Sequence, residues 1–277
     1  MFTVFTMLSL SSSKIPAVVK RSKYGIVTIF SKNHGCEAIN SCRTYANVSE
    51  IRGGSVAIVA LYAPDVSETM LAAYRKYCPS VQLRPFTVDN YPAYFKDYSN
   101  YRFKFPIVAS VLPEFDTIMY IDTSIQFQKK KGKLLKLFKS METKFAPQGI
   151  RLLSNATHSN FPVTHPDMYA FFNVTEEQVT KRSSQFQSGV YLLNNSPQGW
   201  NIVDKMVQCA LEPRCMAPKG AKVKCEYDDL TKNERVVCHR FDQSALNMRL
   251  IELYGTNESL YYQPSSIIDV VRMSKCF

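Results

Sequence analysis

Thr117-Ile118-Met119-Tyr120-Ile121-Asp122-Thr123-Ser124 is an almost unbroken apolar run that ends in a carboxylate, with a hydroxyl two residues later. The run is short and rich in β-branched and aromatic residues, a composition that favours a strand buried on both faces. Ligands of open α/β sheets bind beyond the carboxyl ends of the strands, which is where this pattern places Asp122. A carboxylate there suits a hard cation that bridges to phosphate oxygens. The alternative is that Asp122 only begins a turn, and the spacing alone leaves both interpretations open.

Outward from this stretch, strand-like and helix-like segments alternate along the chain. Apolar, β-branched segments predict strands, and apolar residues at helical spacing predict helices between them. The helix after Pro64 has Asp65 as its expected N-cap, and the last helix is expected to end at Gly255. We expect strands at residues 24–30, 55–62, 81–88, 117–121, 149–154 and 186–193, helices ending near Arg52 and Leu112 and spanning 65–77, 133–141, 197–211 and 242–254, and a loop at 159–172.

This alternation predicts parallel βαβ units. At 277 residues the chain is long enough for one large domain or two small ones. No linker interrupts it after residue 24, so residues 24–277 are expected to form one domain. Residues 1–23 hold a short apolar segment and a basic linker. The apolar segment is too short to span a bilayer and lacks the preceding positive charge of a signal peptide. We interpret residues 1–23 as a weak signal or anchor remnant.

The composition is that of a folded, basic protein. Forty-five per cent of the residues are hydrophobic, and the formal net charge is +11, a balance that suits anionic partners without selecting one. The one dense basic run, Lys129-Lys130-Lys131-Gly132-Lys133, is interpreted either as a solvated turn before a helix or as an electrostatic funnel for a diphosphate. Aromatic residues are not interleaved with the basic ones in a repeated way, so nucleic acid is not an expected partner.

Cysteines and glycosylation sequons together indicate the secretory pathway. No C-x-x-C pair occurs, which favours disulfides over a zinc site or a thioredoxin-like redox motif, with the pairing left open. Acceptor sequons begin at four asparagines, and a fifth at Asn194 is weakened by the proline that follows it. The cysteines are Cys36, Cys42, Cys78, Cys209, Cys215, Cys225, Cys238 and Cys276, and the four sequons begin at Asn47, Asn155, Asn173 and Asn257.

A second polar stretch, His239-Arg240-Phe241-Asp242-Gln243, stands where the last helix is expected to begin. Asp242 could serve there as an N-cap, but the polar density exceeds what a cap needs. Gly189, near the start of a predicted strand, marks a bulge or a close approach of a ligand to the backbone. The sequence contains no Gly-rich phosphate loop, no H-E-x-x-H and no G-x-S-x-G, so it lacks the motifs of P-loop, zinc peptidase and α/β-hydrolase sites.

These stretches carry a resemblance to a known family. The apolar strand that ends in Asp-Thr-Ser, the later Ser-Gly-Val, and Phe-Asp-Gln-Ser-Ala-Leu-Asn resemble nucleotide-sugar glycosyltransferases of the GT-A fold. The last motif is similar to the Asp-Gln-x-x-Leu-Asn helix start of glycogenin-type enzymes. More closely, the pattern resembles a family of GT-A-like domains expanded in nematodes, over roughly residues 24 to 270. The carrying segments are 101–104, 120–124, 209–212, 215–218 and 238–247.

The resemblance implies a fold and a donor-binding site. The fold is a single α/β GT-A-like (Rossmann-like) domain with a mixed, mostly parallel central sheet flanked by helices. Asp122 and Ser124 match the Asp-x-Asp motif, which in the family holds a divalent cation, Mn²⁺ or Mg²⁺, against the donor diphosphate. Because Ser124 replaces the second carboxylate with a weaker ligand, the implied metal dependence is in doubt. The other matched positions are Arg102 and Lys104 at the phosphates, Ser188 and Gly189 beside the sugar, Asp242 and Gln243 at the reaction centre, and His239 as a loosely matched metal ligand.

The function implied is transfer of a sugar from a nucleotide-diphosphate sugar, such as a UDP-sugar, to an acceptor hydroxyl on a glycan or protein in the secretory pathway. The alternative is a secreted or Golgi GT-A-like binding module that has lost catalysis. The Ser124 departure and the weak N-terminal signal support the alternative, so both hypotheses are carried forward.

Overall fold

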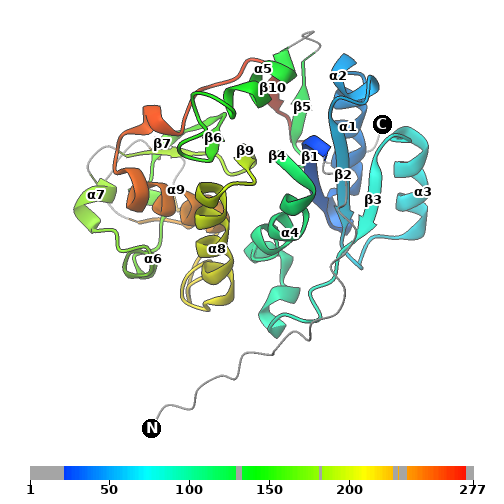
Figure 1. Ribbon diagram of the computed structural model, residues 1–277. Helices are drawn as coiled ribbons and strands as arrows, with labels where there is room; N and C mark the ends of the chain where they lie inside the picture. The colour runs from blue at the N-terminus through cyan, green and yellow to red at the C-terminus, as the bar shows by residue number, and fades with distance from the viewer. Residues whose placement is uncertain (1–21, 129–132, 181–182, 227–229, 231–235, 273–277) are drawn as a thin grey trace, which may run out of the picture.

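The computed structural model describes residues 22–128, 133–180, 183–226, 230 and 236–272. They form an α/β fold around a six-stranded sheet with the strand order β3-β2-β1-β4-β9-β6 (Figure 1). The strands are β1 (Ser22–Phe30), β2 (Ala57–Tyr62), β3 (Gln82–Pro85), β4 (Phe115–Ile121), β9 (Val190–Asn194) and β6 (Ile150–Leu152).

The sheet is mixed and mostly parallel, as predicted. β1 pairs in parallel with both β2 and β4, and β2 pairs in parallel with β3. β9 alone runs the other way, because it is antiparallel to β4 and to β6. The order reverses at β1: the chain leaves β1 for β2 on one side, and β4 later returns to the other side. Such a switch point opens a crevice beyond the carboxyl ends of the two strands.

Both faces of β4 are buried, which explains its unbroken apolar run. Ile118 and Tyr120 pack into the cluster on one face, and Met119 and Ile121 into the cluster on the other. Successive side chains of a strand point to opposite faces, so the part of β4 from Ile118 to Ile121, which is covered on both sides, is apolar at every position. The first face is covered by α4 (Lys104–Val111), α8 (Pro197–Leu211) and α9 (Phe241–Tyr254), and the second by α1 (Gly35–Tyr45), α3 (Glu68–Tyr77) and α5 (Lys133–Ser140).

Two short antiparallel pairs that the sequence did not predict lie outside the main sheet. β7 (Asn155–Ser159) pairs with β8 (Ser184–Phe186), and β5 (Ile125–Phe127) pairs with β10 (Ile268–Val270). The second pair brings the C-terminal segment next to the end of β4. The remaining elements are α2 (Ser49–Arg52), α6 (Asp167–Phe171), α7 (Glu176–Thr180) and the short 3-10 helices η1 (Lys32–His34), η2 (Ala93–Lys96), η3 (Tyr98–Asn100), η4 (Leu112–Glu114), η5 (Phe161–Val163) and η6 (Glu258–Leu260).

Two local predictions were wrong. The segment 159–172 is not a plain loop, because it contains η5 and α6. Asp65 is not the N-cap of α3: the hydroxyl of Ser67 accepts the hydrogen bond from the Met70 amide, and the Asp65 carboxylate accepts one from the Lys32 amide instead. The helix therefore starts later than expected, at the residue after the serine that caps it.

Three disulfides join cysteines of the described residues: Cys42–Cys78, Cys209–Cys215 and Cys225–Cys238. The first ties α1 to the end of α3. These bonds confirm the preference for disulfides over metal ligation and settle the pairing within the cysteine-rich segment 209–238. Cys36 is disulfide-bonded as well.

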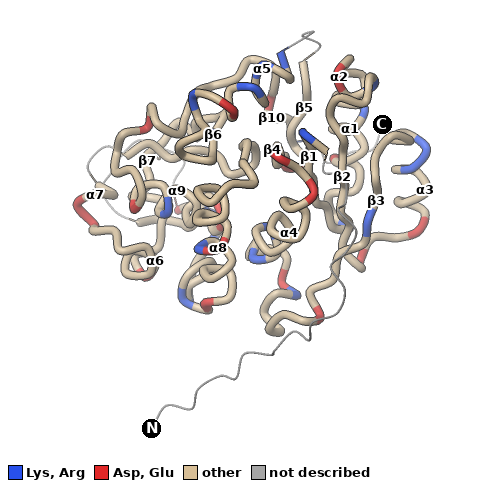
Figure 2. Tube along the Cα trace, in the orientation of Figure 1, with Lys and Arg blue, Asp and Glu red and all other residues tan. Residues whose placement is uncertain are grey.

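Figure 2 shows acidic and basic residues interspersed along the described helices and loops. No described helix has the length and apolar content needed to cross a membrane. The predicted N-terminal remnant falls almost entirely in residues 1–21, and most of the lysine run falls in 129–132. Both stretches lie outside the described residues.

Candidate functional site

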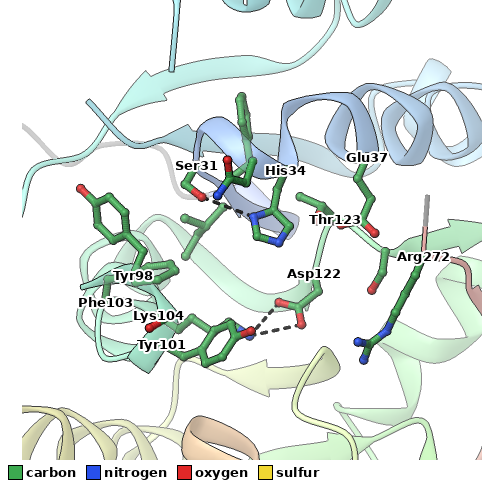
Figure 3. Close-up of a pocket in the computed structure, with 15 residues that line it drawn as sticks. Ser31, His34, Glu37, Tyr98, Tyr101, Phe103, Lys104, Asp122, Thr123 and Arg272 are labelled. Carbon is green, nitrogen blue, oxygen red and sulfur yellow. Dashed lines mark hydrogen bonds and ion pairs between the residues drawn. The ribbon is translucent and has the colours of Figure 1, made fainter. Parts of the chain in front are cut away.

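A cavity of about 660 Å³ opens at the carboxyl ends of β1 and β4 (Figure 3). Its walls come from four stretches of the chain that lie far apart in sequence. They are the end of β1 with η1 and the start of α1, part of segment 98–104, the residues after β4, and Arg272 after β10. The cavity therefore occupies the crevice that the reversal of strand order at β1 creates.

A buried ammonium group joins two carboxylates at the base of this cavity. The Lys104 Nζ lies 2.9 Å from Asp122 Oδ1 and 3.0 Å from Asp242 Oδ2. Lys104 comes from the first turn of α4, Asp122 directly follows β4, and Asp242 stands in the first turn of α9. The structure thus brings together three of the residues named from the sequence. Asp122 and Lys104 line the cavity, and Asp242 lies behind them with 4% of its surface exposed.

Neighbouring groups hold both carboxylates in place. The Tyr120 hydroxyl donates to Asp122 Oδ1 at 2.8 Å, and the Ser188 hydroxyl donates to Asp242 Oδ2 at 2.7 Å. Gly189 accepts the Asp122 amide through its carbonyl at 2.7 Å. A Cβ at Gly189 would lie 2.8 Å from Asp122 Oδ2, so a larger residue at this position would have to displace the Asp122 carboxylate.

Burial and the neighbouring charges of opposite sign act in opposite directions on the pKa values of this cluster. Burial lowers the pKa of Lys104, but the neighbouring Asp122 and Asp242 outweigh it, and the net effect raises the pKa of the ammonium. Burial also raises the pKa of Asp242, against the opposing effect of Lys104. The ammonium therefore stays charged at neutral pH and compensates carboxylates that would be costly to bury alone.

Two aromatic residues next to the cluster, of which Tyr101 lines the cavity, have an uncommon backbone conformation. Tyr101 has a φ of 54° and Phe241 a φ of 44°, the left-handed region that bulky side chains rarely adopt. Their ring centroids lie 6.0 Å apart, and the Lys104 Nζ lies 4.8 Å from the centroid of the Tyr101 ring. Conformations of this kind cluster at functional sites, where the surrounding structure imposes them.

Arg102 does not lie in the cavity. Its guanidinium is buried and donates to the carbonyl of Ala210 in the last turn of α8 and to those of Glu212, Pro213 and Ala217 in the loop that follows. Two of its nitrogens therefore bind main-chain carbonyls rather than facing an open phosphate site. The structure assigns Arg102 to anchoring this loop, and the phosphate role expected from the sequence is not supported.

The His239 side chain also contacts other parts of the chain instead of the cavity. It is 1% exposed, its Nδ1 accepts the His165 amide at 3.2 Å, and its Nε2 lies 3.1 Å from the Met216 carbonyl. Burial lowers the pKa of His239 to about 4, so the imidazole is neutral at physiological pH. Both ring nitrogens have main-chain partners and neither faces the cavity, so the geometry does not support the loosely matched metal role.

Asp242 does not act as a helix cap. The N-cap of α9 is Arg240, without a side-chain cap bond, and the Asp242 carboxylate points to Lys104 and Ser188 instead. Gln243 is half-buried, and its side-chain amide donates to the Gln185 side chain at 2.6 Å. Gln243 lies next to the cluster in the chain but is not part of the cavity wall.

Arg272 lines the cavity and was not predicted from the sequence. The Val271 amide donates to the Ser124 carbonyl at 2.7 Å, which continues the β5–β10 pairing and holds Arg272 beside the motif after β4. β10 has three residues, and its pairing joins segments far apart in the chain. No local sequence pattern signals such a contact.

The described residues do not fit a divalent cation at the Asp-x-Asp position. They hold no group of three or more His, Cys, Asp or Glu side chains placed to bind a metal. Lys104 lies within 3.2 Å of both Asp122 oxygens, and the second motif position is Ser124. A six-coordinate oxygen site needs more ligands than Asp122 and this hydroxyl provide.

Replacing Lys104 by methionine is expected to cost about 3–5 kcal/mol of unfolding free energy near neutral pH, because it leaves two carboxylates unpaired in a largely buried place. The loss should shrink as the pH falls. A buried carboxyl with a raised pKa binds its proton more tightly in the folded chain than in the unfolded one, so ionisation costs stability, and that cost disappears as pH drops through the raised pKa. Urea unfolding at about pH 8 and about pH 5 measures both effects.

Lys136→Met, on the exposed face of α5, is the matched control and should change stability little at either pH. The double variant Lys104→Met/Asp242→Asn should recover part of the loss, since it removes one of the unpaired charges. If Lys104→Met and Lys136→Met lost the same free energy of unfolding at both pH values, the pairing of Lys104 with Asp122 and Asp242 would be contradicted.

No protein-family model and no curated protein matches this sequence. Solved structures with a similar fold include mouse xyloside xylosyltransferase 1, at 13% identity over 88% of this chain and 85% of that one with a TM-score of 0.49. The galactosyltransferase LgtC, solved with donor and acceptor sugar analogs, is 13% identical to this chain. The match covers 86% of this chain and 72% of LgtC, with a TM-score of 0.47. The S. cerevisiae mannosyltransferase Ktr4p, solved with GDP, is 9% identical to this chain. The match covers 89% of this chain and 70% of Ktr4p, with a TM-score of 0.46. At these values the similarity concerns only the fold.

Proposed function

We propose that this chain is a GT-A-like glycosyltransferase that binds a nucleoside diphosphate sugar, such as a UDP-sugar, in the cavity beyond β1 and β4. The observation that carries the proposal is the convergence of Asp122, Lys104 and Asp242 at the switch point of the sheet. Three distant segments place charged side chains at the position where open α/β sheets bind their ligands. The raised pKa values of Lys104 and Asp242 at such a place are typical of functional sites.

The cavity suits the proposed donor in size and chemistry. Its volume of about 660 Å³ falls within the range of small-molecule sites. One wall carries polar residues after β1, including Asn33 and His34, and another carries the aromatic residues Tyr98 and Tyr101. Arg272 supplies a cation on the wall, and a guanidinium can bind phosphate oxygens through two parallel hydrogen bonds.

In the proposed reaction, an acceptor hydroxyl attacks the anomeric carbon while the bond to the diphosphate oxygen breaks. The bonding electrons leave with the diphosphate, and the products are the glycosylated acceptor, the nucleoside diphosphate and a proton. Arg272 stabilises the charge that develops on the departing diphosphate. Asp122 faces the bound donor, and Lys104, Asp242 and Ser188 act as positioning residues that hold Asp122 in its rotamer.

The second candidate function is a GT-A-like binding module without catalysis. Two observations favour it: Ser124 stands at the second carboxylate position of the motif, and Lys104 engages both carboxylates of the cluster. A site whose two carboxylates are both engaged by Lys104 could hold a nucleotide sugar without reacting it.

Calorimetry and donor hydrolysis together separate the two functions. The folded chain is expected to bind UDP. When it is tested against a panel of UDP-sugars, it is expected to hydrolyse its own donor slowly and so to release UDP. Asp122→Ala should change the UDP affinity by about tenfold or more, because it removes one of the two carboxylates that hold the Lys104 ammonium at the base of the cavity. Asp204→Ala, on the exposed face of α8, is the matched control and should bind like the parent.

An unchanged UDP affinity in Asp122→Ala would contradict the assigned site. Donor binding without hydrolysis or transfer for any sugar would favour the module. If the folded chain binds no nucleoside diphosphate, the proposed function is wrong.

We also propose that the chain folds in the secretory pathway. The disulfides Cys42–Cys78, Cys209–Cys215 and Cys225–Cys238 support this compartment, because cytosolic thiols are kept reduced. Three sequon asparagines are exposed and accessible to glycan attachment: Asn47, Asn173 and Asn257. Asn155 is half-buried, and its side-chain oxygen accepts the Thr157 amide.

Chain produced through a secretory cell line is therefore expected to carry N-glycans at Asn47, Asn173 and Asn257. Treatment with a peptide N-glycosidase should lower its mass, and each of the three Asn→Gln variants should remove one glycan. Asn155→Gln is the control and should leave the mass pattern unchanged. Secreted chain in which all three exposed asparagines lack a glycan would contradict the proposed compartment.

A further inference from the structure

We propose that this cavity binds its diphosphate ligand without a divalent cation: the Lys104 ammonium occupies the cation position between Asp122 and Asp242, and the Arg272 guanidinium binds the diphosphate. The inference deepens the proposed function and rests on it. It concerns what neutralises the donor's charge, a role that the Asp-x-Asp resemblance assigns to Mn²⁺ or Mg²⁺.

The first argument is that the carboxylate oxygens are already engaged. Asp122 Oδ1 accepts from both Lys104 and Tyr120, and its Oδ2 lies 3.2 Å from the same ammonium. Asp242 Oδ2 accepts from Lys104 and Ser188. A divalent cation held by these oxygens at 2.0–2.6 Å would lie close to the ammonium, and two cations that close repel each other strongly away from bulk water.

The second argument is that Lys104 cannot readily leave. Its side chain is 7% exposed, and its Nζ lies 4.8 Å from the Tyr101 ring centroid and 5.7 Å from that of Tyr120. Moving the ammonium out would leave the Asp242 carboxylate, itself 6% exposed, without its compensating charge. Breaking a buried pair in this way is strongly destabilising, so the ammonium is a permanent part of the site.

The third argument is that the described residues offer no replacement ligand. Ser124 presents a hydroxyl where the motif has a carboxylate, and a hydroxyl is a weaker ligand for a hard cation. The His239 ring nitrogens are engaged by the His165 amide and the Met216 carbonyl. The described ranges hold no group of three or more His, Cys, Asp or Glu side chains placed to bind a metal.

The fourth argument is the position of Arg272. Figure 3 shows Arg272 and Tyr101 on either side of Asp122, and both line the cavity. Among the described residues no ion pair or hydrogen bond engages the Arg272 side chain, and the residue is exposed. A fork of guanidinium N–H donors facing an open cavity matches the paired oxygens of a diphosphate.

Calorimetry of UDP binding in EDTA and in MnCl₂ tests the inference. The dissociation constants in the two buffers should agree within about threefold, a difference below 1 kcal/mol. In EDTA, Arg272→Gln should weaken UDP binding by about tenfold or more, since it removes charge-assisted hydrogen bonds. Arg52→Gln, an exposed arginine of α2 outside the cavity, is the matched control and should bind UDP like the parent.

The outcomes separate the inference from the function on which it rests. UDP binding that requires Mn²⁺, or that Mn²⁺ tightens by more than about tenfold, overturns the inference and leaves the proposed function standing. Unchanged binding by Arg272→Gln in EDTA overturns the role of Arg272. Absence of UDP binding in both buffers, by protein whose unfolding transition shows that it is folded, overturns the proposed function and the inference together.

Discussion

The charge balance around the Lys104 ammonium constrains the whole functional end of this molecule. Lys104 and Asp242 are 138 residues apart in the chain, yet their charged atoms lie 3.0 Å apart and are almost completely buried. A buried pair of this kind does not necessarily increase stability over an apolar core, but it penalises every arrangement that separates the charges. It therefore fixes the first turn of α4, the end of β4 and the start of α9 relative to one another. These three segments carry the charged cluster at the base of the cavity, so the same pairing determines the shape of this part of its wall.

Much of the fold was predictable because the signals are local. β4 is apolar at successive positions since helices cover both of its faces, and its boundary at Asp122 is visible in the sequence. The α/β class and the mostly parallel sheet followed from the alternation of strands and helices and from the GT-A resemblance. Asp122, Lys104, Asp242, Ser188 and Gly189 were all named from the sequence, and the structure places them in one cluster. Their grouping in one site was implied by the GT-A resemblance, and each of them stands at or next to one end of a regular element.

The remaining errors have physical causes that no local pattern reveals. Arg102 stands two residues before Lys104, but its guanidinium donates to carbonyls in the last turn of α8 and in the loop that follows. A basic residue that serves a ligand and one that serves a buried loop look alike in sequence. His239 does not face the cavity for a similar reason, because its ring nitrogens contact the main chain at positions 165 and 216. Arg272 was missed because it reaches the cavity only through the pairing of β10 with β5, a contact between segments remote in sequence.

The most direct test is a crystal structure of the chain grown in EDTA with a UDP-sugar that resists hydrolysis. The account predicts the diphosphate in the cavity beyond β1 and β4, within hydrogen-bond distance of Arg272. It also predicts the Lys104 Nζ still between Asp122 and Asp242. A nucleotide bound elsewhere on the chain, or a Lys104 side chain turned toward solvent with its two carboxylates apart, would contradict the account.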